Sequence, residues 1–293
     1  MIVRPTADGV VALAPAKLNL FLEVLGKRAD GYHDLESLMV TVNLHDTLTF
    51  ADDPSGRITL TCDDPSLPTG PENLVVKAAE GLRRRMGVER GATIHLSKAI
   101  PSQAGLAGGS SDAAATLSAL DRLWNLSTPP GVIDALAGEI GSDVAFFRHA
   151  PAAVCRGRGE RVEPIATSRA LHFVVVCPPV GLSTADVYGN LDLPDRPRPI
   201  EPILEAFSRG EISTLGTLLF NRLQGVAERL EPGVVAIRDA LRQLGSPTLD
   251  GSLMSGSGSA YFGLARDRDA AEVAALHLTT LGLGRVRVVS CGP

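Results

Sequence analysis

The sequence is poor in aromatic side chains, in lysine and in net positive charge. Phe, Trp and Tyr make up 4% of its 293 residues, and the formal net charge is −5 at pH 7. Lysine occurs at only four positions: Lys17, Lys27, Lys77 and Lys98. A protein that binds nucleic acid without regard to sequence needs a basic face. We therefore expect no nucleic-acid partner, although a local basic pocket for phosphates stays possible.

The sequence also lacks a long apolar run and a cysteine motif. No run approaches the ~20 apolar residues that a helix needs to cross a bilayer, and the first residues lack the apolar segment of a secretory signal. The cysteines are widely scattered: Cys62, Cys155, Cys177 and Cys291. No C-x-x-C pair occurs, which argues against a zinc site or a disulfide framework. We expect a cytoplasmic protein with reduced thiols and no membrane partner.

The hydrophobic pattern predicts an α+β protein with two domains, residues 1–165 and 166–293. Alternating apolar residues predict a strand over residues 10–25. Further expected strands of the first half are 37–44, 47–51, 57–62 and 93–96. Its expected helices are 72–86, 110–124 and 131–140, and a strand or turn is expected at 143–147.

The second half has a different order of elements. A strand at 171–177 is followed by helical segments near 184–190, 202–209, 212–222 and 232–244. A segment at 248–254, a strand at 260–265, a helix at 269–281 and a strand at 285–290 complete the chain. Strand, helix, two strands, helix, strand is the split βαβ order of a ferredoxin-like domain.

The most informative segment is a glycine- and serine-rich loop before an alanine-rich helix, IPSQAGLAGGSSDAAA at residues 100–115. Its glycines, Gly105, Gly108 and Gly109, allow the backbone to approach a ligand closely. Free N–H groups at the start of a helix bind phosphate well. Ser and Asp are also ordinary helix-capping residues, so the loop alone leaves both interpretations open. Neither G-x-x-x-x-G-K-[ST] nor G-x-G-x-x-G occurs.

Three segments together resemble the GHMP kinases, the group that includes galactokinase, homoserine kinase and mevalonate kinase. The loop P-x-x-x-G-L-x-G-G-S-S-D-A-A is similar to the second motif of that family, APAKLNL at 14–20 to the first, and LMSGSGSA at 253–260 to the third. The resemblance implies an N-terminal domain like ribosomal protein S5 and a C-terminal ferredoxin-like domain. It also implies that the third motif packs beside the phosphate loop.

Within the family, the chain most resembles the kinases that act on 4-diphosphocytidyl-2-C-methyl-D-erythritol. The similar segments are PAKLNLFLEV, KRADGYHDLESL, ENLVVKAA, GGSSDAA and GSDVAFF. They imply ATP-dependent phosphorylation of the 2-hydroxyl of this cytidine diphosphate-linked polyol, in non-mevalonate isoprenoid precursor biosynthesis. The chain departs from the pattern at Ser102–Ala104 and Ala107, where those kinases carry more glycine.

The resemblance implies that Lys17 and Asp143 are catalytic. Phosphoryl transfer to an alcohol needs an aligned hydroxyl, a group that takes its proton, and positive charge near the developing negative charge. Asp143 is the candidate base, and Lys17 is expected to pair with it and to orient the hydroxyl. Taken alone, Asp143 is more simply an aspartate that caps a helix or turn, and Lys17 a surface cation at a strand end. The match of both positions to the family pattern reverses this preference.

The resemblance also implies an ATP site and a substrate site. The expected ATP contacts are Pro101, Ser102, Gln103, Ala104, Gly105, Leu106, Ala107, Gly108, Gly109, Ser110 and Ser111, with Asn73 and Lys98 near the adenine. Mg²⁺ is expected with ATP, with Ser110 or Ser111 close to it and its ligands unassigned. The expected substrate contacts are Asn19, Tyr32, His33 and Tyr188. Two tyrosine rings can enclose a pyrimidine, and His33 can bond its polar edge.

Two other functions stay open at this point. Another kinase of the same family, of the homoserine or mevalonate type, is disfavoured by the Gly31-Tyr32-His33 turn and by Tyr188. A ligand-binding relative without activity is disfavoured because Lys17 and Asp143 are both present.

Overall fold

The computed structural model describes residues 1–149 and 151–292. One residue of each expected domain, Ala150 and Pro293, lies outside the described residues. The chain forms two compact units whose segments interleave. Unit 1 comprises Met1–Ala16, Leu44–Ile100 and Ala107–Ala150, and unit 2 comprises Lys17–Asn43, Pro101–Leu106 and Pro151–Pro293. The expected domain boundary at 165 and 166 remains a prediction.

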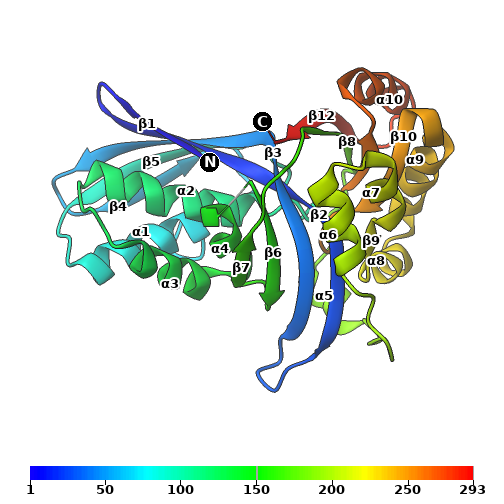
Figure 1. The fold of residues 1–293 in the computed structure, drawn as a ribbon. Helices are drawn as coiled ribbons and strands as arrows, with labels where there is room; N and C mark the ends of the chain where they lie inside the picture. The colour runs from blue at the N-terminus through cyan, green and yellow to red at the C-terminus, as the bar shows by residue number, and fades with distance from the viewer. Residues whose placement is uncertain (150, 293) are drawn as a thin grey trace. The chain divides into compact units, whose positions relative to one another are not determined.

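Unit 1 is a sheet covered by helices on one face (Figure 1). The strand order is β1-β2-β3-β5-β4, where β1 is Ile2–Thr6, β2 is Gly9–Lys27, β3 is His33–Asp53, β4 is Ile58–Cys62 and β5 is Gly91–Ser97. The helices are α1 Leu74–Met86, α2 Gly108–Leu123, α3 Pro130–Ile140 and α4 Ser142–His149. Strands β4 and β5 pair in parallel, whereas β1 with β2 and β3 with β5 are antiparallel. Alternate residues of the strands, such as Ile94 and Leu96 of β5, are buried, so the sheet presents one apolar face to the helices.

Local sequence explains where the helices of unit 1 begin and end. The side chain of Asn73 accepts a hydrogen bond from the backbone N–H of Val75 at 2.9 Å, which caps α1. Gly87 ends the same helix with φ 64°, a left-handed conformation that glycine adopts without strain. Between these ends, Val75, Ala79 and Leu82 are buried on one face of α1. Helix α2 is buried from Ser111 to Leu117 and again at Ala119 and Leu120, and several of these residues are small.

Unit 2 contains the remaining parts of β2 and β3 together with a second, separate sheet. Strand β3 pairs with β6 (Ala152–Gly157), β6 pairs with β7 (Arg161–Pro164), and β9 (Phe220–Asn221) runs parallel to β2. The second sheet has the order β10-β11-β8-β12, with β8 Leu171–Cys177, β10 Leu249–Met254, β11 Tyr261–Ala265 and β12 Arg285–Cys291. All its neighbours are antiparallel. This order confirms the predicted ferredoxin-like arrangement.

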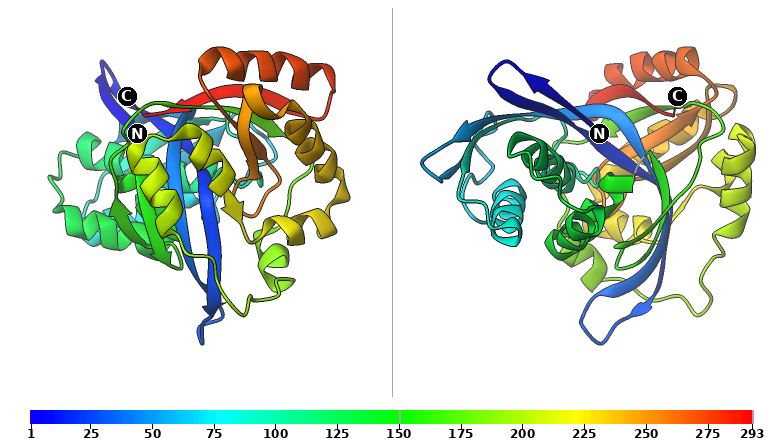
Figure 2. Two further views of the ribbon diagram at one scale, coloured as in Figure 1. Left: turned by 45° about the vertical axis from the view of Figure 1, so that its right-hand side comes forward. Right: turned by 60° about the vertical axis from the view of Figure 1, so that its left-hand side comes forward.

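Helices pack against the second sheet and extend from it. They are α5 Thr184–Gly189, α6 Glu201–Arg209, α7 Ile212–Leu218, α8 Gln224–Leu230, a short 3₁₀ helix Pro232–Val234, α9 Val235–Thr248 and α10 Arg268–Thr280. Figure 2 shows α10 lying along the sheet, where it contacts β8 and β12. Val174, Val176 and Leu278 belong to the apolar core of this unit. No helix in the described part of the chain is long and apolar enough to cross a membrane.

The structure corrects several expectations about local elements. Residues 143–147 are not a strand or turn but lie in the helix α4. The apolar run Val144–Phe147 is too short to distinguish a helix from a strand by its pattern, and Asp143 in the first turn favours the helix. The two strands expected at 37–44 and 47–51 form the single strand β3, and the helix expected at 212–222 ends at Leu218. Strand β1 and helix α8 were not predicted.

Candidate active site

In unit 2 the lysine of the first motif is buried beside an asparagine of the same strand. Lys17 is 3% exposed, and its ammonium donates a hydrogen bond to the side-chain oxygen of Asn19. The two residues lie two apart in β2 and therefore point to the same face of the sheet. The backbone N–H of Lys17 donates to the carbonyl of Leu106 at 3.1 Å, which ties this strand to the glycine-rich loop that is predicted to bind phosphate.

The amide of Asn19 is held in one orientation by its neighbours. Its Nδ2 donates to the Ser37 hydroxyl at 2.8 Å, and that hydroxyl donates to the carbonyl of Phe21 at 2.6 Å. The amide nitrogen is thus engaged on β3, and the amide oxygen faces the ammonium of Lys17. A fixed amide of this kind also fixes the position of the buried ammonium.

The third glycine-rich motif packs against the first part of the phosphate loop, as predicted. The Ser255 hydroxyl accepts a hydrogen bond from the backbone N–H of Asn19 at 3.4 Å and donates to the carbonyl of Gly105 at 3.0 Å. A Cβ on Gly105 would lie 2.0 Å from the carbonyl oxygen of Ser255. A Cβ on Gly256 would lie 2.9 Å from Nζ of Lys17. Close backbone approach therefore explains both glycines.

Asn221 holds the third motif in place, and the sequence reasoning missed it. Its Nδ2 donates to the carbonyls of Met254 at 2.8 Å and Gly256 at 2.7 Å, while its oxygen accepts from the backbone N–H of Leu223 at 2.9 Å. The amide nitrogen thus binds the backbone on both sides of Ser255, and the oxygen binds the backbone of its own segment. No local pattern signals such a role, because Met254 and Gly256 lie more than 30 residues away in the sequence.

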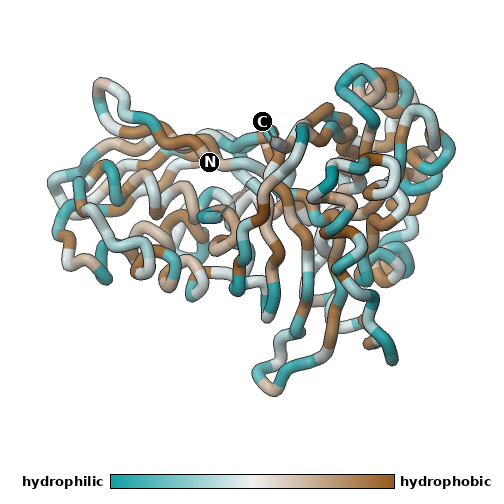
Figure 3. Tube along the Cα trace, viewed as in Figure 1, coloured by the Kyte–Doolittle hydropathy of each residue, from teal (hydrophilic) through white to brown (hydrophobic). Residues whose placement is uncertain are grey.

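Aromatic and basic side chains from separate segments meet near the tip of the β2–β3 hairpin in unit 2. The rings of His33 and Tyr188 lie 5.2 Å apart at 31°. The guanidinium of Arg158, from the β6–β7 turn, lies 4.8 Å from the ring centroid of Tyr32, a cation–π contact. Tyr32 is 54% exposed, and Figure 3 shows the hairpin tip as mainly hydrophilic. Arg158 was not predicted from the sequence.

In unit 1 the second part of the glycine-rich loop forms the start of α2. Ala107 has φ 56°, and the backbone N–H of Ser111 donates to its carbonyl at 3.0 Å. A Cβ on Gly108 would lie 3.0 Å from a side-chain carbon of Ile100, whereas a Cβ on Gly109 would meet nothing closer than 3.9 Å. The hydroxyl of Ser111 and one carboxylate oxygen of Asp112 are buried without a hydrogen-bond partner. Such unpaired atoms are costly, and a bound ligand would satisfy them.

Lys98 lies between two buried carboxylates of unit 1. Its ammonium makes ion pairs with Asp46 and with Asp112, the latter at 2.9 Å. Burial, followed by the neighbouring Asp46, raises the pKa of Asp112 to about 7 against the opposing effect of Lys98. Burial lowers the pKa of Lys98, but the two carboxylates outweigh it and raise that pKa above its ordinary value.

Two further predicted residues lie at helix ends of unit 1. Asn73 caps α1 and donates from Nδ2 to the carbonyl of Pro68 at 2.7 Å. Asp143 lies in the first turn of α4. This helix begins directly after Gly141, the residue that caps the end of α3. Lys17 belongs to unit 2 and Asp143 to unit 1, so their pairing remains a prediction. The adenine contacts of Asn73 and Lys98 also remain predictions.

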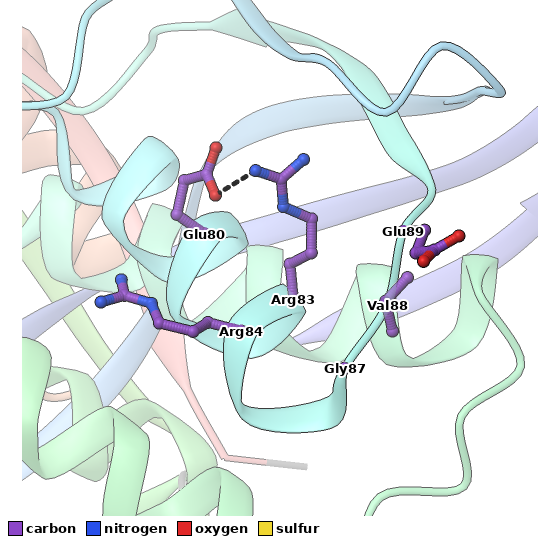
Figure 4. Close-up of a pocket in the computed structure, with 6 residues that line it drawn as sticks. All are labelled: Glu80, Arg83, Arg84, Gly87, Val88 and Glu89. Carbon is purple, nitrogen blue, oxygen red and sulfur yellow. Dashed lines mark hydrogen bonds and ion pairs between the residues drawn. The ribbon is translucent and has the colours of Figure 1, made fainter.

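An open hollow of about 630 Å³ lies elsewhere in unit 1, at the C-terminal end of α1 (Figure 4). Its lining residues are Glu80, Arg83, Arg84, Gly87, Val88 and Glu89. Arg83 is paired with Glu80 at 2.7 Å and also donates to the carbonyl of Gly56. None of the predicted site residues lines this hollow, so we do not assign the site to it.

Comparison with known proteins decides the family. The family models for the GHMP kinases N terminal domain and the GHMP kinases C terminal match residues 73–151 and 203–282. A protein of Pelotomaculum thermopropionicum named 4-diphosphocytidyl-2-C-methyl-D-erythritol kinase is 43% identical over 92% of this chain and 94% of its own length. The chain belongs to the GHMP kinases. It is therefore an ATP-dependent small-molecule kinase, as the sequence predicts.

Other relatives agree with this assignment. A Bacillus cytotoxicus protein with the same name is 41% identical over 86% of both chains. The crystal structure of a 4-(cytidine 5'-diphospho)-2C-methyl-D-erythritol kinase, 40% identical, superposes with a TM-score of 0.80 and covers 97% of this chain and 99% of its own. A homoserine kinase from Cytophaga hutchinsonii has a TM-score of 0.79 over 100% of this chain and 97% of its own, but at 19% identity this likeness shows only the GHMP kinase fold.

The residues of the site are compatible with a magnesium ion that ATP brings with it. No group of three or more His, Cys, Asp or Glu side chains that could hold a metal occurs within residues 1–149 and 151–292. The unpaired hydroxyl of Ser111 and the unpaired oxygen of Asp112 are hard oxygen donors at the start of α2. Mg²⁺ commonly takes few protein ligands and keeps phosphate and water oxygens. The donor set therefore fits an ion held mainly by the nucleotide.

Proposed function

We propose that this chain transfers the γ-phosphate of ATP to the 2-hydroxyl of 4-diphosphocytidyl-2-C-methyl-D-erythritol, a step of non-mevalonate isoprenoid precursor biosynthesis. The observation that carries the proposal is the high identity over most of the chain to kinases named for this substrate. The buried Lys17–Asn19 pair beside the phosphate loop supports it. We expect the reaction in the cytoplasm, where ATP is available.

The residues divide the chemistry between proton transfer and charge stabilisation. Asp143 accepts the proton of the 2-hydroxyl while the oxygen of that hydroxyl forms a bond to the γ-phosphorus. The bond from the γ-phosphorus to the β,γ-bridging oxygen breaks, which releases ADP. Lys17 orients the hydroxyl, and its ammonium stabilises the negative charge that develops on the oxygen. Asn19 fixes that ammonium and contacts the hydroxyls of the methylerythritol.

The glycine-rich loop holds the phosphates of ATP. Backbone N–H groups within residues 102–110 and the positive end of α2 face the nucleotide in this proposal. Ser110 or Ser111 would lie near the Mg²⁺ that accompanies ATP, and the ion would supply positive charge against the phosphates. The departures at Ser102, Gln103, Ala104 and Ala107 keep their backbone N–H groups, so ATP binding does not depend on glycine there.

The cytidine is recognised by the aromatic residues of unit 2. Tyr32 and Tyr188 flank the base, and His33 bonds its polar edge. Replacing the ring of Tyr32 or Tyr188 by alanine removes a stacking contact, which is worth ~1–3 kcal/mol in nucleic-acid binders. We expect Tyr32→Ala or Tyr188→Ala to raise the acceptor KM by about tenfold or more and to leave the KM of ATP unchanged.

The matched control is Tyr261, a tyrosine away from this cluster. Its ring is buried in β11, and its hydroxyl donates to Glu228 at 3.0 Å. Tyr261→Phe should lower the melting temperature without a change in the acceptor KM. Steady-state kinetics with both substrates varied measures these effects, and an unchanged acceptor KM in Tyr32→Ala and Tyr188→Ala would refute the base-stacking role.

The protonation state of His33 should also affect substrate binding. Burial, followed by the charge of Lys27, lowers the pKa of His33 below its ordinary value of 6.5. The folded protein therefore keeps this ring neutral at pH 7, able to accept a hydrogen bond from the amino group of cytosine. We expect the acceptor KM to be constant between about pH 7 and 8 and to rise as the pH falls and His33 takes up a proton.

The pH effect is measured with paired cytidine and uridine acceptors. Uracil presents a carbonyl where cytosine presents an amino group, so acidification should weaken the cytidine acceptor more than the uridine acceptor. His33→Ala should remove the difference between the two profiles. Identical pH profiles for both acceptors in the parent protein would show that His33 does not read the base.

The substrate assignment itself is tested by kcat/KM for a set of alcohols. The set comprises 4-diphosphocytidyl-2-C-methyl-D-erythritol, the same polyol without its cytidine, homoserine and mevalonate, each with ATP. We expect efficient transfer only to the first. Equal efficiency with an acceptor that lacks a nucleobase would contradict the cytidine site and would leave the kinase assignment intact.

A further inference from the structure

A buried ion cluster in unit 1 connects the two chain segments that flank the phosphate loop. The first segment, Lys98–Ile100, follows strand β5 and leads into the loop. The second is the first turn of α2, which contains Asp112. Asp46, which lies in β3, completes the cluster. Lys98 is 8%, Asp46 0% and Asp112 2% exposed in their side chains.

Asp46 fixes the segment that enters the loop. Its Oδ1 accepts hydrogen bonds from the backbone N–H groups of Ala99 at 2.7 Å and Ile100 at 2.9 Å. Its Oδ2 accepts from the ammonium of Lys98. A single carboxylate thus holds three successive residues immediately before Pro101. Charge-assisted bonds of this kind are shorter and stronger than bonds between neutral groups.

Lys98 extends the same network to the segment that leaves the loop. Its ammonium donates to Oδ2 of Asp112 at 2.9 Å. Gly108, the first residue of α2, lies so close that a Cβ there would be 3.1 Å from Nζ of Lys98 and 3.0 Å from a side-chain carbon of Ile100. The ammonium of a residue that precedes the loop therefore lies beside Gly108 and Asp112, where the loop ends.

Stability alone does not account for this cluster. Burying charged groups costs free energy that their mutual attraction only partly returns, so apolar side chains of similar volume would serve a core equally well. The cost applies here because the side chains of Lys98, Asp46 and Asp112 are 8%, 0% and 2% exposed. One oxygen of Asp112 also lacks a partner. A cluster kept at such a cost points to a role in placing the loop.

We propose that Asp46, Lys98 and Asp112 form a loop clamp, a positioning cluster that fixes both ends of the phosphate loop and thereby sets its affinity for the phosphates of ATP. The inference rests on the proposed function of this loop. The clamp acts on the nucleotide through the backbone, since the ammonium of Lys98 is engaged by the two carboxylates. A Cβ at Gly108 would crowd Lys98 and Ile100, whereas a Cβ at Gly109 would not reach this cluster.

The test removes the ammonium from the clamp in the full-length protein. Lys98→Met leaves the carboxylates of Asp46 and Asp112 buried without their cation. The second variant, Lys98→Met/Asp112→Asn, replaces the carboxylate of Asp112 by a neutral amide. Asp46 keeps its charge and the two backbone N–H donors of Ala99 and Ile100. Calorimetry then gives the affinities for ATP, ADP and adenosine. Because a misplacement of ~1 Å in a site can cost about 100-fold, we expect ATP and ADP to bind about ten- to 100-fold more weakly.

In this proposal Lys98 positions the loop in place of the predicted adenine contact. Adenosine, which lacks phosphates, should therefore bind both variants within about twofold of the parent, and the acceptor KM should stay equally constant. The control is Asp121→Asn on the same helix, whose carboxylate accepts from the backbone N–H of Thr128 at 2.9 Å, far along α2 from the loop. This control should lower the melting temperature and leave all three affinities unchanged. Amide hydrogen exchange should quicken at Ala99, Ile100 and the first turn of α2 in the Lys98 variants only.

Each other outcome would overturn the clamp. Unchanged ATP affinity in a folded Lys98 variant would show that the cluster does not position the loop, and an equal loss of adenosine affinity would show that Lys98 contacts the adenine directly. Unfolding of the double variant would make the cluster a stability element. If Gly109→Val also leaves ATP binding unchanged, the phosphate-loop assignment itself fails, which separates that failure from failure of the clamp.

Discussion

Asp143→Asn should reduce kcat by about 10²–10⁴-fold while the affinity for ATP changes little, because general-base catalysis is typically worth that much. The amide has the shape of the carboxylate but takes up no proton, so the 2-hydroxyl must attack while still protonated. The same substitution removes the negative partner proposed for Lys17. Single-turnover kinetics with saturating ATP and acceptor measures the chemical step directly.

The control for Asp143 is an aspartate that supports the same helix without a role in the chemistry. Asp134 in α3 accepts from Nε of Arg148 in α4 at 3.2 Å. Asp134→Asn should therefore loosen α4 and lower the melting temperature but retain most of kcat. A rate for Asp143→Asn close to that of Asp134→Asn would show that Asp143 only starts a helix.

Gly109→Val should weaken ATP binding by two orders of magnitude or more, about 3 kcal/mol, in a protein that still folds. A Cβ at this position meets nothing closer than 3.9 Å, so the folded chain accommodates a side chain there. The branched side chain would instead occupy the space through which the backbone N–H groups at the start of α2 reach a phosphate. The acceptor affinity should change far less.

Gly138→Val is the matched control for this substitution. Gly138 lies inside α3, and a Cβ added there would meet no atom within 4 Å, so this position also has room for a side chain. Both variants place the same branched side chain in a helix, so their effects on folding should be similar. Calorimetry with ATP should separate them, and equal ATP affinities in the two folded variants would remove the phosphate loop from the account.

Much of the fold follows from local patterns in the sequence. The alternating apolar residues of β2, the apolar run of β8 and the apolar face of α1 predict these elements within a few residues. The order of strands and helices after residue 170 predicts the ferredoxin-like sheet. Helix α4 was missed because its apolar run is as short as a strand, and β9 because its two residues depend on pairing with β2 rather than on their own pattern.

The candidate site residues that lie in sequence motifs could be predicted. The residues that hold them through contacts between distant parts of the sequence could not. Lys17, Asn19 and the glycine-rich turns lie in motifs, and the structure brings the parts that belong to unit 2 together. Asn221, Arg158 and Asp46 act on partners far away in the sequence, and each is an ordinary polar residue in its local context. Their roles arise from tertiary contacts, which no single-sequence pattern encodes.

The position of the new phosphate on the product tests the central claim most directly. In 4-diphosphocytidyl-2-C-methyl-D-erythritol, the second carbon carries a methyl group and no hydrogen, so a phosphate on its hydroxyl has no proton three bonds away. The proton-coupled ³¹P spectrum of the product formed with ATP should therefore show one new monoester resonance without splitting by a carbon-bound proton. A new resonance split by such protons would place the phosphate on another hydroxyl, and the absence of any new ester while ADP forms would contradict transfer to this substrate.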